Sequence, residues 1–372
     1  MKRKFYISIA ALALCFGALY SCREEITASN QFEETPLVYA LLDPNDTIHY
    51  VKINRAFIGP GNSFDIAKIA DSSYYSTSIC IITEKSGNAT LRTWTLRDTI
   101  LQTKESGLFA APEVRLKYFK TTVASPLITD KTYKLDLDVE NGKYKVSGST
   151  ALVQGLGVTT STNNSPFTFR TSAGAYTNPA VAYNKGDAAV IDARLRIKIR
   201  EYKSNGDSLT TVFDMKIDER STADITGISQ TVNATGETFY QTVANSITDD
   251  ATIIRRVLLN TDVIITGGSE DFYSYITVSK PSTSLAQTKP VFTNLTCINS
   301  AGVNSRVVGI FSSRTTFIAI KPAWKVNPSN INSPFRGIDK NSMKELAIGQ
   351  YTGTKLFCST CIIDASELWS CP

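Results

Sequence analysis

Cysteine thiols are the groups in this chain whose spacing most readily suggests chemistry. Cys358 and Cys361 form a C-x-x-C pair, and Cys371 follows in the C-terminal tail. With Cys297 they could supply four thiolates to zinc, and the C-x-x-C pair alone could act as a redox couple. Nothing near the pair resembles a thioredoxin βαβ unit. We therefore expect at least one structural disulfide in the tail, with its partners left open among these four cysteines.

A row of basic residues is the best candidate for ligand binding. Residues 189–200 alternate between apolar and polar side chains, which predicts a long strand with one polar face. The basic members of that face are Arg194, Arg196, Lys198 and Arg200. They could bind an anionic glycan, lipid headgroups or an acidic partner protein. We favour the alternative that these charges protect a long strand against edge-to-edge pairing.

Residues for common hydrolytic mechanisms are sparse. His49 is the only histidine, and it lies within a predicted strand, so we interpret it as structural. Asp136, Asp138 and Glu140 are close in sequence, but they alternate outward along a predicted hairpin and miss the EF-hand spacing. The patterns G-x-S-x-G, S-x-x-K, H-E-x-x-H and the P-loop are absent from the sequence. We therefore predict no catalytic residue, cofactor or metal.

The first residues indicate a location. Residues 1–21 read as a signal peptide, with a basic start and an apolar run over residues 5–19 that is short for a membrane span. Leu19-Tyr20-Ser21-Cys22 then resembles a bacterial lipobox, which predicts that Cys22 is lipidated with acyl chains such as palmitate. The acidic residues after Arg23 resemble the surface-export signal of Bacteroidota lipoproteins. The alternative is an ordinary cleaved signal that leaves Cys22 as a spare thiol.

Composition indicates a folded, exported protein. The hydrophobic fraction is 42% and the charged fraction is 20%, values typical of globular chains. The net charge of +5 falls to about +2 once the three basic residues of the signal are removed, which gives no general attraction to nucleic acid. After loss of the signal and lipidation, five cysteines remain, and an exported setting favours disulfides between them.

Turn signals and alternating residues predict a mainly β protein with two domains after a tether of residues 22–35. We expect an N-terminal, Ig-like β-sandwich over 36–153. Its clearest part is a hairpin over 132–147 with the favoured turn pair Asn141-Gly142, a register that places Asp138 opposite Lys145. We expect a second β-rich domain with a few short helices over 154–372.

Local patterns in the second domain predict further elements. The strand over 189–200 turns at Asn205-Gly206 and returns over 208–217, and residues 236–249 have helical spacing. Residues 307–311 and 316–320 look like a strand pair, whereas 252–259 and 272–278 fit either strand or helix. Ser342 with Glu345 fits a capping box at the start of a short helix.

Several segments together resemble a known family. They are the lipobox at Cys22, the strand pair over 38–55, residues 290–294 followed by 309–314, and the Cys358/Cys361 pair with Trp369. The chain is similar to uncharacterised Bacteroidota outer-membrane lipoproteins that are grouped only as a domain of unknown function, the 4249 type or a close relative. The resemblance implies a non-enzymatic role beside a TonB-dependent receptor, and it carries no catalytic residues.

Three functional hypotheses follow. The first is a lipid-anchored outer-membrane protein, exposed at the cell surface, with a binding or accessory role beside a TonB-dependent receptor. The second is a fimbrillin-like pilin or adhesin that assembles by strand exchange. The third is a glycan-cleaving or glycan-binding module, which buried carboxylates facing an aromatic-walled cleft would favour.

Overall fold

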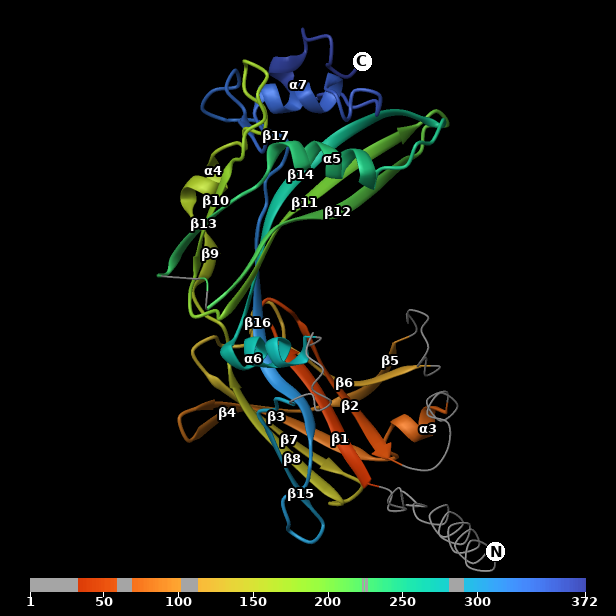
Figure 1. Ribbon diagram of the computed structural model, residues 1–372, viewed down its shortest axis with the longest axis vertical. Coiled ribbons are helices and arrows are strands. Elements are labelled where there is room, and N and C mark those ends of the chain that lie inside the picture. Colours follow the sequence, from red (N-terminus) through yellow and green to blue (C-terminus); the bar gives the residue numbers. More distant parts are fainter. Residues whose placement is uncertain (1–32, 59–68, 102–112, 223, 225–226, 281–290) are drawn as a thin grey trace, which may run out of the picture.

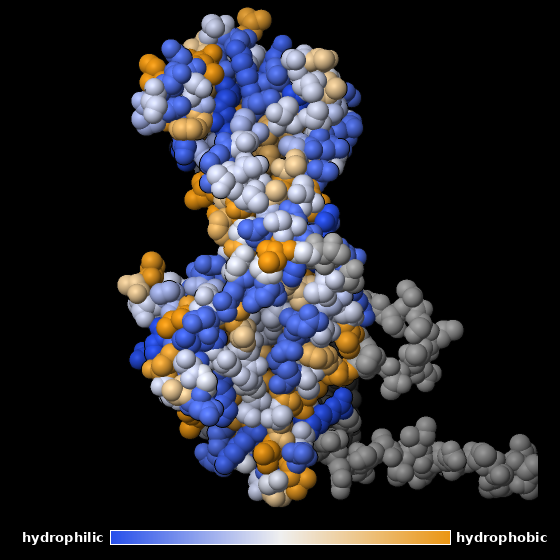
Figure 2. All heavy atoms as spheres, turned by 90° about the vertical axis from the view of Figure 1, so that its left-hand side faces the viewer, coloured by the Kyte–Doolittle hydropathy of each residue, from blue (hydrophilic) through white to orange (hydrophobic). Residues whose placement is uncertain are grey.

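The computed structural model describes residues 33–58, 69–101, 113–222, 224, 227–280 and 291–372. Strands dominate it and the helices are short, which confirms the predicted mainly β class. The molecule is elongated, with two lobes joined by a narrow waist (Figures 1 and 2). The described chain starts at the lower end of the lower lobe and ends at the top of the upper lobe (Figure 1).

The lower lobe is a β-sandwich. Its strands are β1 (Glu33–Leu42), β2 (Ile48–Ile58), β3 (Ser78–Ser86), β4 (Ala89–Thr95), β5 (Arg97–Leu101), β6 (Val114–Lys120), β7 (Thr132–Val139), β8 (Tyr144–Ala151), β15 (Leu295–Asn299) and β16 (Val308–Ala319). One layer is the five-stranded sheet β15-β8-β7-β3-β4. The other is part of an eight-stranded sheet, in the order β16-β1-β2-β6-β5. A short helix, α3 (Ala70–Ser73), lies beside β2.

Apolar side chains from both layers form the lower core. Val38, Val51, Leu135 and Leu137 are among its buried members, and the polar residues between them face outward, as strand alternation requires. The turn after β7 has the register predicted from its sequence, because Asp138 pairs with Lys145 across the hairpin. The predicted sandwich and its best-defined hairpin are therefore confirmed.

The upper lobe continues the same eight-stranded sheet. Its elements are β9 (Leu156–Val158), α4 (Thr160–Asn164), β10 (Ala180–Lys185), β11 (Val190–Lys203), β12 (Ser208–Ser221), β13 (Ser229–Asn233), α5 (Gly236–Ser246), β14 (Ile253–Gly268), β17 (Trp324–Lys325), β18 (Phe335–Arg336), α7 (Lys340–Ile348) and the 3₁₀ turn Ile362–Asp364. Helix α6 (Glu270–Ser279) follows β14 but lies at the top of the lower lobe, beside β16 (Figure 1). Strands β12-β11-β14 lead to β16, and a small sheet β13-β10-β9 with α5 and α7 completes the upper core.

The division of the chain between the two cores corrects the predicted domains. The chain leaves the lower core between Leu152 and Val153, because Leu152 packs in the lower core and Val153 in the upper one. This agrees with the expected boundary at 153/154. However, Leu295, Cys297 and Phe311 return to the lower core. The lower lobe therefore needs β15 and β16, and 154–372 is not a separate second domain.

Two local predictions are wrong, and two ambiguous segments are resolved. Residues 307–311 and 316–320 are not a strand pair, because both lie in or beside the single long strand β16. The cap of α7 is Asp339, whose carboxylate accepts a hydrogen bond from the Ser342 backbone N–H, so the predicted capping box is wrong. The two ambiguous segments resolve as part of β14 and as α6, respectively.

Gly309 tests how tightly β16 is held beside β1. Its φ is +121°, and an added Cβ would lie 1.9 Å from the Val38 carbonyl oxygen. Gly302 also has a positive φ, +74°, but a Cβ there would meet nothing within 4 Å. We expect Gly309→Ala to lower the unfolding free energy by roughly 3 kcal/mol or more, through both strain and backbone collision. Gly302→Ala should cost only about 1–2 kcal/mol.

The unfolding free energies of both variants and of the unchanged protein are measured by denaturant unfolding. Equal losses for Gly309→Ala and Gly302→Ala would show that the backbone approach at Val38 contributes nothing beyond the conformation of the glycine.

Candidate functional site

The cysteine cluster predicted from sequence is only partly assembled. Cys22 lies outside the described residues. Cys358 and Cys371 form a disulfide, so the expected staple in the C-terminal tail is present. Cys361 and Cys297 are buried free thiols, and Cys297 lies in the core of the other lobe. The four thiols therefore do not meet at one zinc site, and the C-x-x-C pair is not a disulfide in this structure.

The tail is fixed by more than its disulfide. The Arg336 guanidinium bonds both oxygens of the buried Asp364 carboxylate, at 3.1 and 2.9 Å. Ser359 Oγ donates to the same carboxylate at 2.7 Å. Cys361 Sγ lies 3.6 Å from Arg336 Nη1, and burial raises the pKa of its thiol. This thiol is therefore a packed structural group rather than an activated nucleophile.

The basic ladder is largely neutralised. Arg194 pairs with Asp192, Arg196 forms two bonds of 2.8 and 2.9 Å to Asp214, and Lys198 lies 3.0 Å from Asp262. Hydrogen bonding to Arg196 lowers the pKa of Asp214. Among the residues that the structure describes, Arg200 reaches only Thr210 Oγ1, at 3.5 Å. The ladder therefore offers little free positive charge to an anionic ligand.

The protective role that we favoured for these charges is also corrected. Strand β11 lies between β12 and β14, so it is not an edge strand. The basic side chains mainly pair with carboxylates on their own strand or on the two neighbouring strands. They satisfy the outward face of a central strand instead of guarding a free edge.

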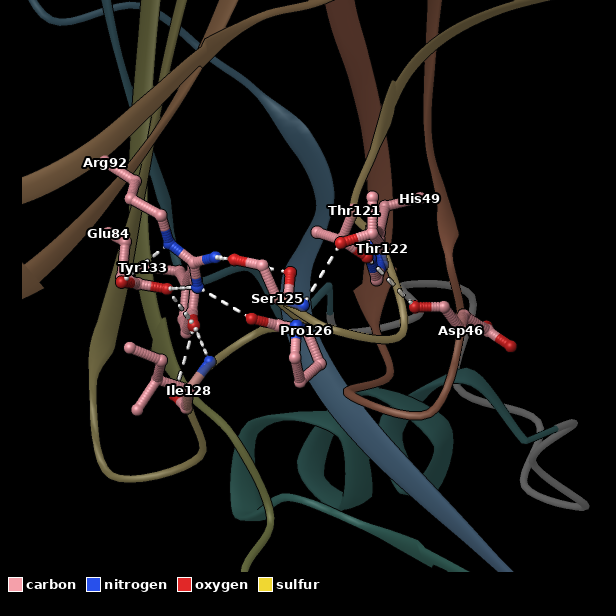
Figure 3. Close-up of polar contacts among 10 residues, drawn as sticks. All are labelled: Asp46, His49, Glu84, Arg92, Thr121, Thr122, Ser125, Pro126, Ile128 and Tyr133. Atoms are coloured by element: carbon pink, nitrogen blue, oxygen red, sulfur yellow. Dashed lines mark hydrogen bonds and ion pairs between the residues drawn. The ribbon is translucent and has the colours of Figure 1, made fainter.

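Two polar clusters fix the loop over 121–131, which crosses from β6 in one layer of the sandwich to β7 in the other (Figure 3). His49 belongs to the first. Its ring stacks on Phe119 at 4.7 Å between centroids, and its Nε2 lies 3.2 Å from Thr121 Oγ1. Burial lowers the pKa of His49 to about 4, although the nearby Asp46 opposes the shift. The imidazole is thus a neutral structural group, as its strand position predicted.

The second cluster is built on a buried carboxylate. Glu84 is 0% exposed, and its two oxygens accept from the Arg92 guanidinium, while Tyr133 Oη donates to it at 2.7 Å. Burial opposes ionisation of Glu84, but these hydrogen bonds hold its pKa below the usual value. Arg92 also donates to Ser125 Oγ at 2.8 Å and to the Pro126 carbonyl (Figure 3). The saturated carboxylate has no role left in acid–base chemistry.

Sequence reasoning missed this cluster. Glu84 occupies the same strand phase as Cys80 and Ile82, which are both buried. A carboxylate in the apolar phase of a strand implies a buried partner, because an unpaired buried charge is costly. The sequence therefore indicates a buried partner for Glu84, but it does not identify Arg92 on the neighbouring strand β4 as that partner.

Lys321 is a second buried charge that the sequence did not reveal. It is 3% exposed, and its Nζ donates to the carbonyls of Thr162, Asn163 and Ser165 at 2.8, 3.2 and 2.8 Å. Burial lowers the pKa of Lys321 to about 8. All three ammonium protons are used, so Lys321 secures the end of α4 rather than acting as a nucleophile.

A pocket of about 310 Å³ opens beside Lys321 in the upper lobe. Its lining combines apolar walls, two amides and basic residues: Asn163, Asn164, Ile320, Lys321, Pro322, Lys325, Phe335, Arg336 and Gly337. No carboxylate is among the described residues that line it. The volume falls at the small end of the range typical of ligand sites. We take it as the candidate binding site of the upper lobe because basic side chains line it.

Other site types find no support in the described parts of the chain. No group of three or more histidine, cysteine or acidic residues there is arranged to hold a metal ion. The described helices are all too short or too polar to cross a membrane.

Comparisons with known proteins add little. No protein-family profile matches the chain, and no curated protein matches it. Among solved structures, it is similar to the C-terminal globular domain of an oligosaccharyltransferase from Pyrococcus abyssi, with 10% identity and a TM-score of 0.22. The match covers 59% of this chain and 41% of that chain, so the chain spans less than half of that structure. A score at this level supports no conclusion about fold or function.

The single histidine allows a clean pH experiment. The pKa of His49 is about 4 in the fold and about 6.5 in an unfolded chain, so the unfolded state binds the extra proton between these values. Stability contributed by neutral His49 is present above pH 6.5 and is lost as the pH falls towards 4. We expect the unfolding free energy of the unchanged protein to fall by on the order of 3 kcal/mol over this range. The His49→Gln variant should lack this fall.

The measurement is the unfolding free energy of the unchanged protein and of His49→Gln at pH 7.5, 6, 5 and 4.5. The imidazole resonances in an NMR titration provide the control, since only one histidine is present. Titration near pH 6.5 would contradict burial of the ring.

Glu84 gives a second prediction. Glu84→Gln leaves the Arg92 guanidinium, which is only 26% exposed, without its anionic partner. We expect a loss of about 3 kcal/mol in unfolding free energy at pH 7. The matched control is Asp136→Asn, which breaks an exposed pair with Lys134 and should cost less than about 1 kcal/mol.

The Glu84 effect has a defined pH window. Because the folded pKa is lowered, the stabilisation is complete above the unfolded value of about 4.3 and disappears as the pH falls through the folded pKa. Chemical unfolding of both variants at pH 7 and pH 3 tests this. A difference between Glu84→Gln and the unchanged protein that persists undiminished at low pH would refute the ionic explanation.

Proposed function

We propose that this protein is a lipid-anchored outer-membrane protein, exposed at the cell surface, with a non-enzymatic binding or accessory role beside a TonB-dependent receptor. The anchor is Cys22, and the acidic residues after Arg23 are the export signal. We also propose that the chain belongs to the family of uncharacterised Bacteroidota lipoproteins that its sequence resembles.

The observation that carries the proposal is the position of β1. This strand begins at the lower end of the molecule, whereas the C-terminus lies at the upper end (Figure 1). The predicted tether of residues 22–35 is too long by three residues, because β1 already begins at Glu33. The remaining residues 22–32 can reach about 40 Å at most, because an extended residue spans up to about 3.6 Å. A lipid at Cys22 therefore keeps the lower lobe near the membrane and directs the upper lobe outward, as a binding role requires.

The carboxylates considered for catalysis support a non-enzymatic role. Asp136 pairs with Lys134, Asp138 accepts from the Gly142 backbone N–H, and Glu140 lies 3.1 Å from Lys143. All three belong to the β7–β8 hairpin and are bound to local partners, without a buried acid facing a cleft.

The pilin alternative has weaker support. Strand exchange uses an open edge of a sheet. Strand β1 is paired on both sides, in parallel with β16 and antiparallel with β2. Removing or exchanging the N-terminal strand would open the middle of the eight-stranded sheet rather than an edge. We therefore rank the anchored accessory protein above a strand-exchanging pilin.

Replacing the anchor cysteine tests the proposal. We expect Cys22→Ser to abolish incorporation of labelled palmitate and to release the protein from the outer-membrane fraction. Cys15→Ser is the matched control, because Cys15 leaves with the signal peptide in the proposed processing and its loss should change neither result. Fractionation, acyl labelling and mass spectrometry of the mature N-terminus provide the measurements.

The receptor part of the proposal needs a separate experiment. A mild-detergent pull-down of the tagged, lipidated protein should recover a TonB-dependent receptor. A mature N-terminus trimmed beyond Cys22 in a self-assembled ladder would instead favour the pilin, and turnover of a glycan or peptide that depends on one carboxylate would overturn the non-enzymatic role.

A further inference from the structure

We propose that the pocket beside Lys321 binds an acidic saccharide, that is, a sugar unit carrying one carboxylate. The inference deepens the proposed binding role, on which it rests, by assigning a ligand class to one surface of the upper lobe. It stands on the charges, the exposed apolar walls and the two weakly bonded amides of the described residues that line the pocket.

The charge of the pocket selects a ligand with one negative charge. Lys325 is exposed and forms no ion pair with any residue in the described parts of the chain. The other two basic side chains are already used: Arg336 bonds Asp364, and Lys321 bonds backbone carbonyls. One free ammonium and no lining carboxylate match a single carboxylate, whereas a phosphate would leave part of its charge without a partner.

The walls suit the flat apolar face of a sugar ring. Phe335 is 47% exposed and Ile320 is 68% exposed, although both line the pocket. Lys325 Nζ lies 5.2 Å from the centre of the Phe335 ring. A sugar whose C–H face stacks on Phe335 would therefore place a carboxylate on its edge within reach of the ammonium. Aromatic and apolar walls with a few polar groups are the usual composition of a ligand site.

Two adjacent side-chain amides can form hydrogen bonds with the hydroxyl groups of a sugar. Asn163 and Asn164 are exposed at the end of α4, and the one side-chain hydrogen bond recorded between them is long, at 3.5 Å. Each amide offers both donors and an acceptor, which is what neighbouring hydroxyls require. Because Lys321 binds the carbonyls of Thr162 and Asn163, the end of α4 is held in place before a ligand arrives.

The floor of the pocket disfavours an extended peptide. The Gly337 N–H donates to the Ala323 carbonyl at 3.1 Å, and the Gly337 carbonyl accepts from Phe167 N–H at 2.9 Å. Neither group is free to pair with an incoming strand, which is how extended peptides gain most of their affinity. The geometry therefore favours a compact ligand with hydroxyl groups over an acidic peptide.

The experiment uses the full lipidated protein in mild detergent. Calorimetry and saturation-transfer NMR measure binding of an acidic trimer with one galacturonic acid and two galactose units, a neutral galactose trimer and a short aspartate-containing peptide. We expect the acidic trimer to bind at least about tenfold more tightly than the neutral one, as expected for one charge-assisted hydrogen bond. The peptide should not compete for the site.

Variants locate the binding site. Lys325→Gln should weaken binding of the acidic trimer about tenfold and leave the neutral trimer unchanged. Lys344→Gln is the matched control, because Lys344 is also exposed, forms no ion pair with a described residue and does not line the pocket. Phe335→Ala should weaken both trimers, and raised salt should weaken only the acidic one.

Several results would overturn the inference. They are equal affinity for acidic and neutral trimers, no effect of Lys325→Gln beyond that of Lys344→Gln, no saccharide binding at all, or binding of the peptide alone. If Phe335→Ala fails to fold, the two lysine variants still decide, since both change an exposed side chain. The lipid at Cys22 and recovery of a receptor are measured separately, so failure here is distinguishable from failure of the proposed function.

Discussion

The strand pairing of β16 is the constraint on which both lobes depend. Its start lies in the lower core, where Phe311 is buried, and its end lies in the upper core, where Ala319 is buried. It is parallel to β1 over the lower part and antiparallel to β14 over the upper part. Between the two cores, Ser312 and Ser313 are fully buried but hydrogen-bonded, to Ser269 Oγ and to the Ala151 carbonyl. Hydrogen bonds therefore replace apolar packing at the waist.

This waist shows what sequence patterns can and cannot predict. Hairpins were predictable because their register depends on adjacent residues: Asn141-Gly142 turns β7 into β8, and Asn205-Gly206 turns β11 into β12. The polar run from Ser312 to Thr316 looked like a break between two strands. In fact Ser313 and Thr315 donate to the backbone carbonyls of Ala151, at the end of β8, and of Val153 just after it. Local polarity cannot distinguish a turn from a buried strand that has distant polar partners.

For the candidate functional residues too, local patterns predicted positions along the chain but not partners in space. Alternation correctly put the ladder of Arg194 and its neighbours on the outer face of β11, but strand order, which the sequence does not contain, decides whether that strand is an edge. The disulfide is similar. Backbone bonds from Ser359 to Trp369 and from Cys371 to Ser359 lay the last residues beside the C-x-x-C segment, and the Cα atoms of Cys358 and Cys371 are 4.9 Å apart. That distance suits a disulfide, whereas the sequence spacing had left the pairing open.

The proposed anchor and the proposed pocket assign different tasks to the two lobes. With a lipid ahead of β1, the lower sandwich would act as a spacer between the membrane and the upper lobe, which carries the pocket with Lys325. A tether of limited reach keeps that pocket within a thin layer above the membrane. Confinement raises the effective concentration of the pocket towards anything bound at a neighbouring receptor. Under both proposals, one lysine without an ion pair to any described residue and one exposed aromatic ring, a weak site for a freely diffusing protein, would be enough for an accessory role at a surface.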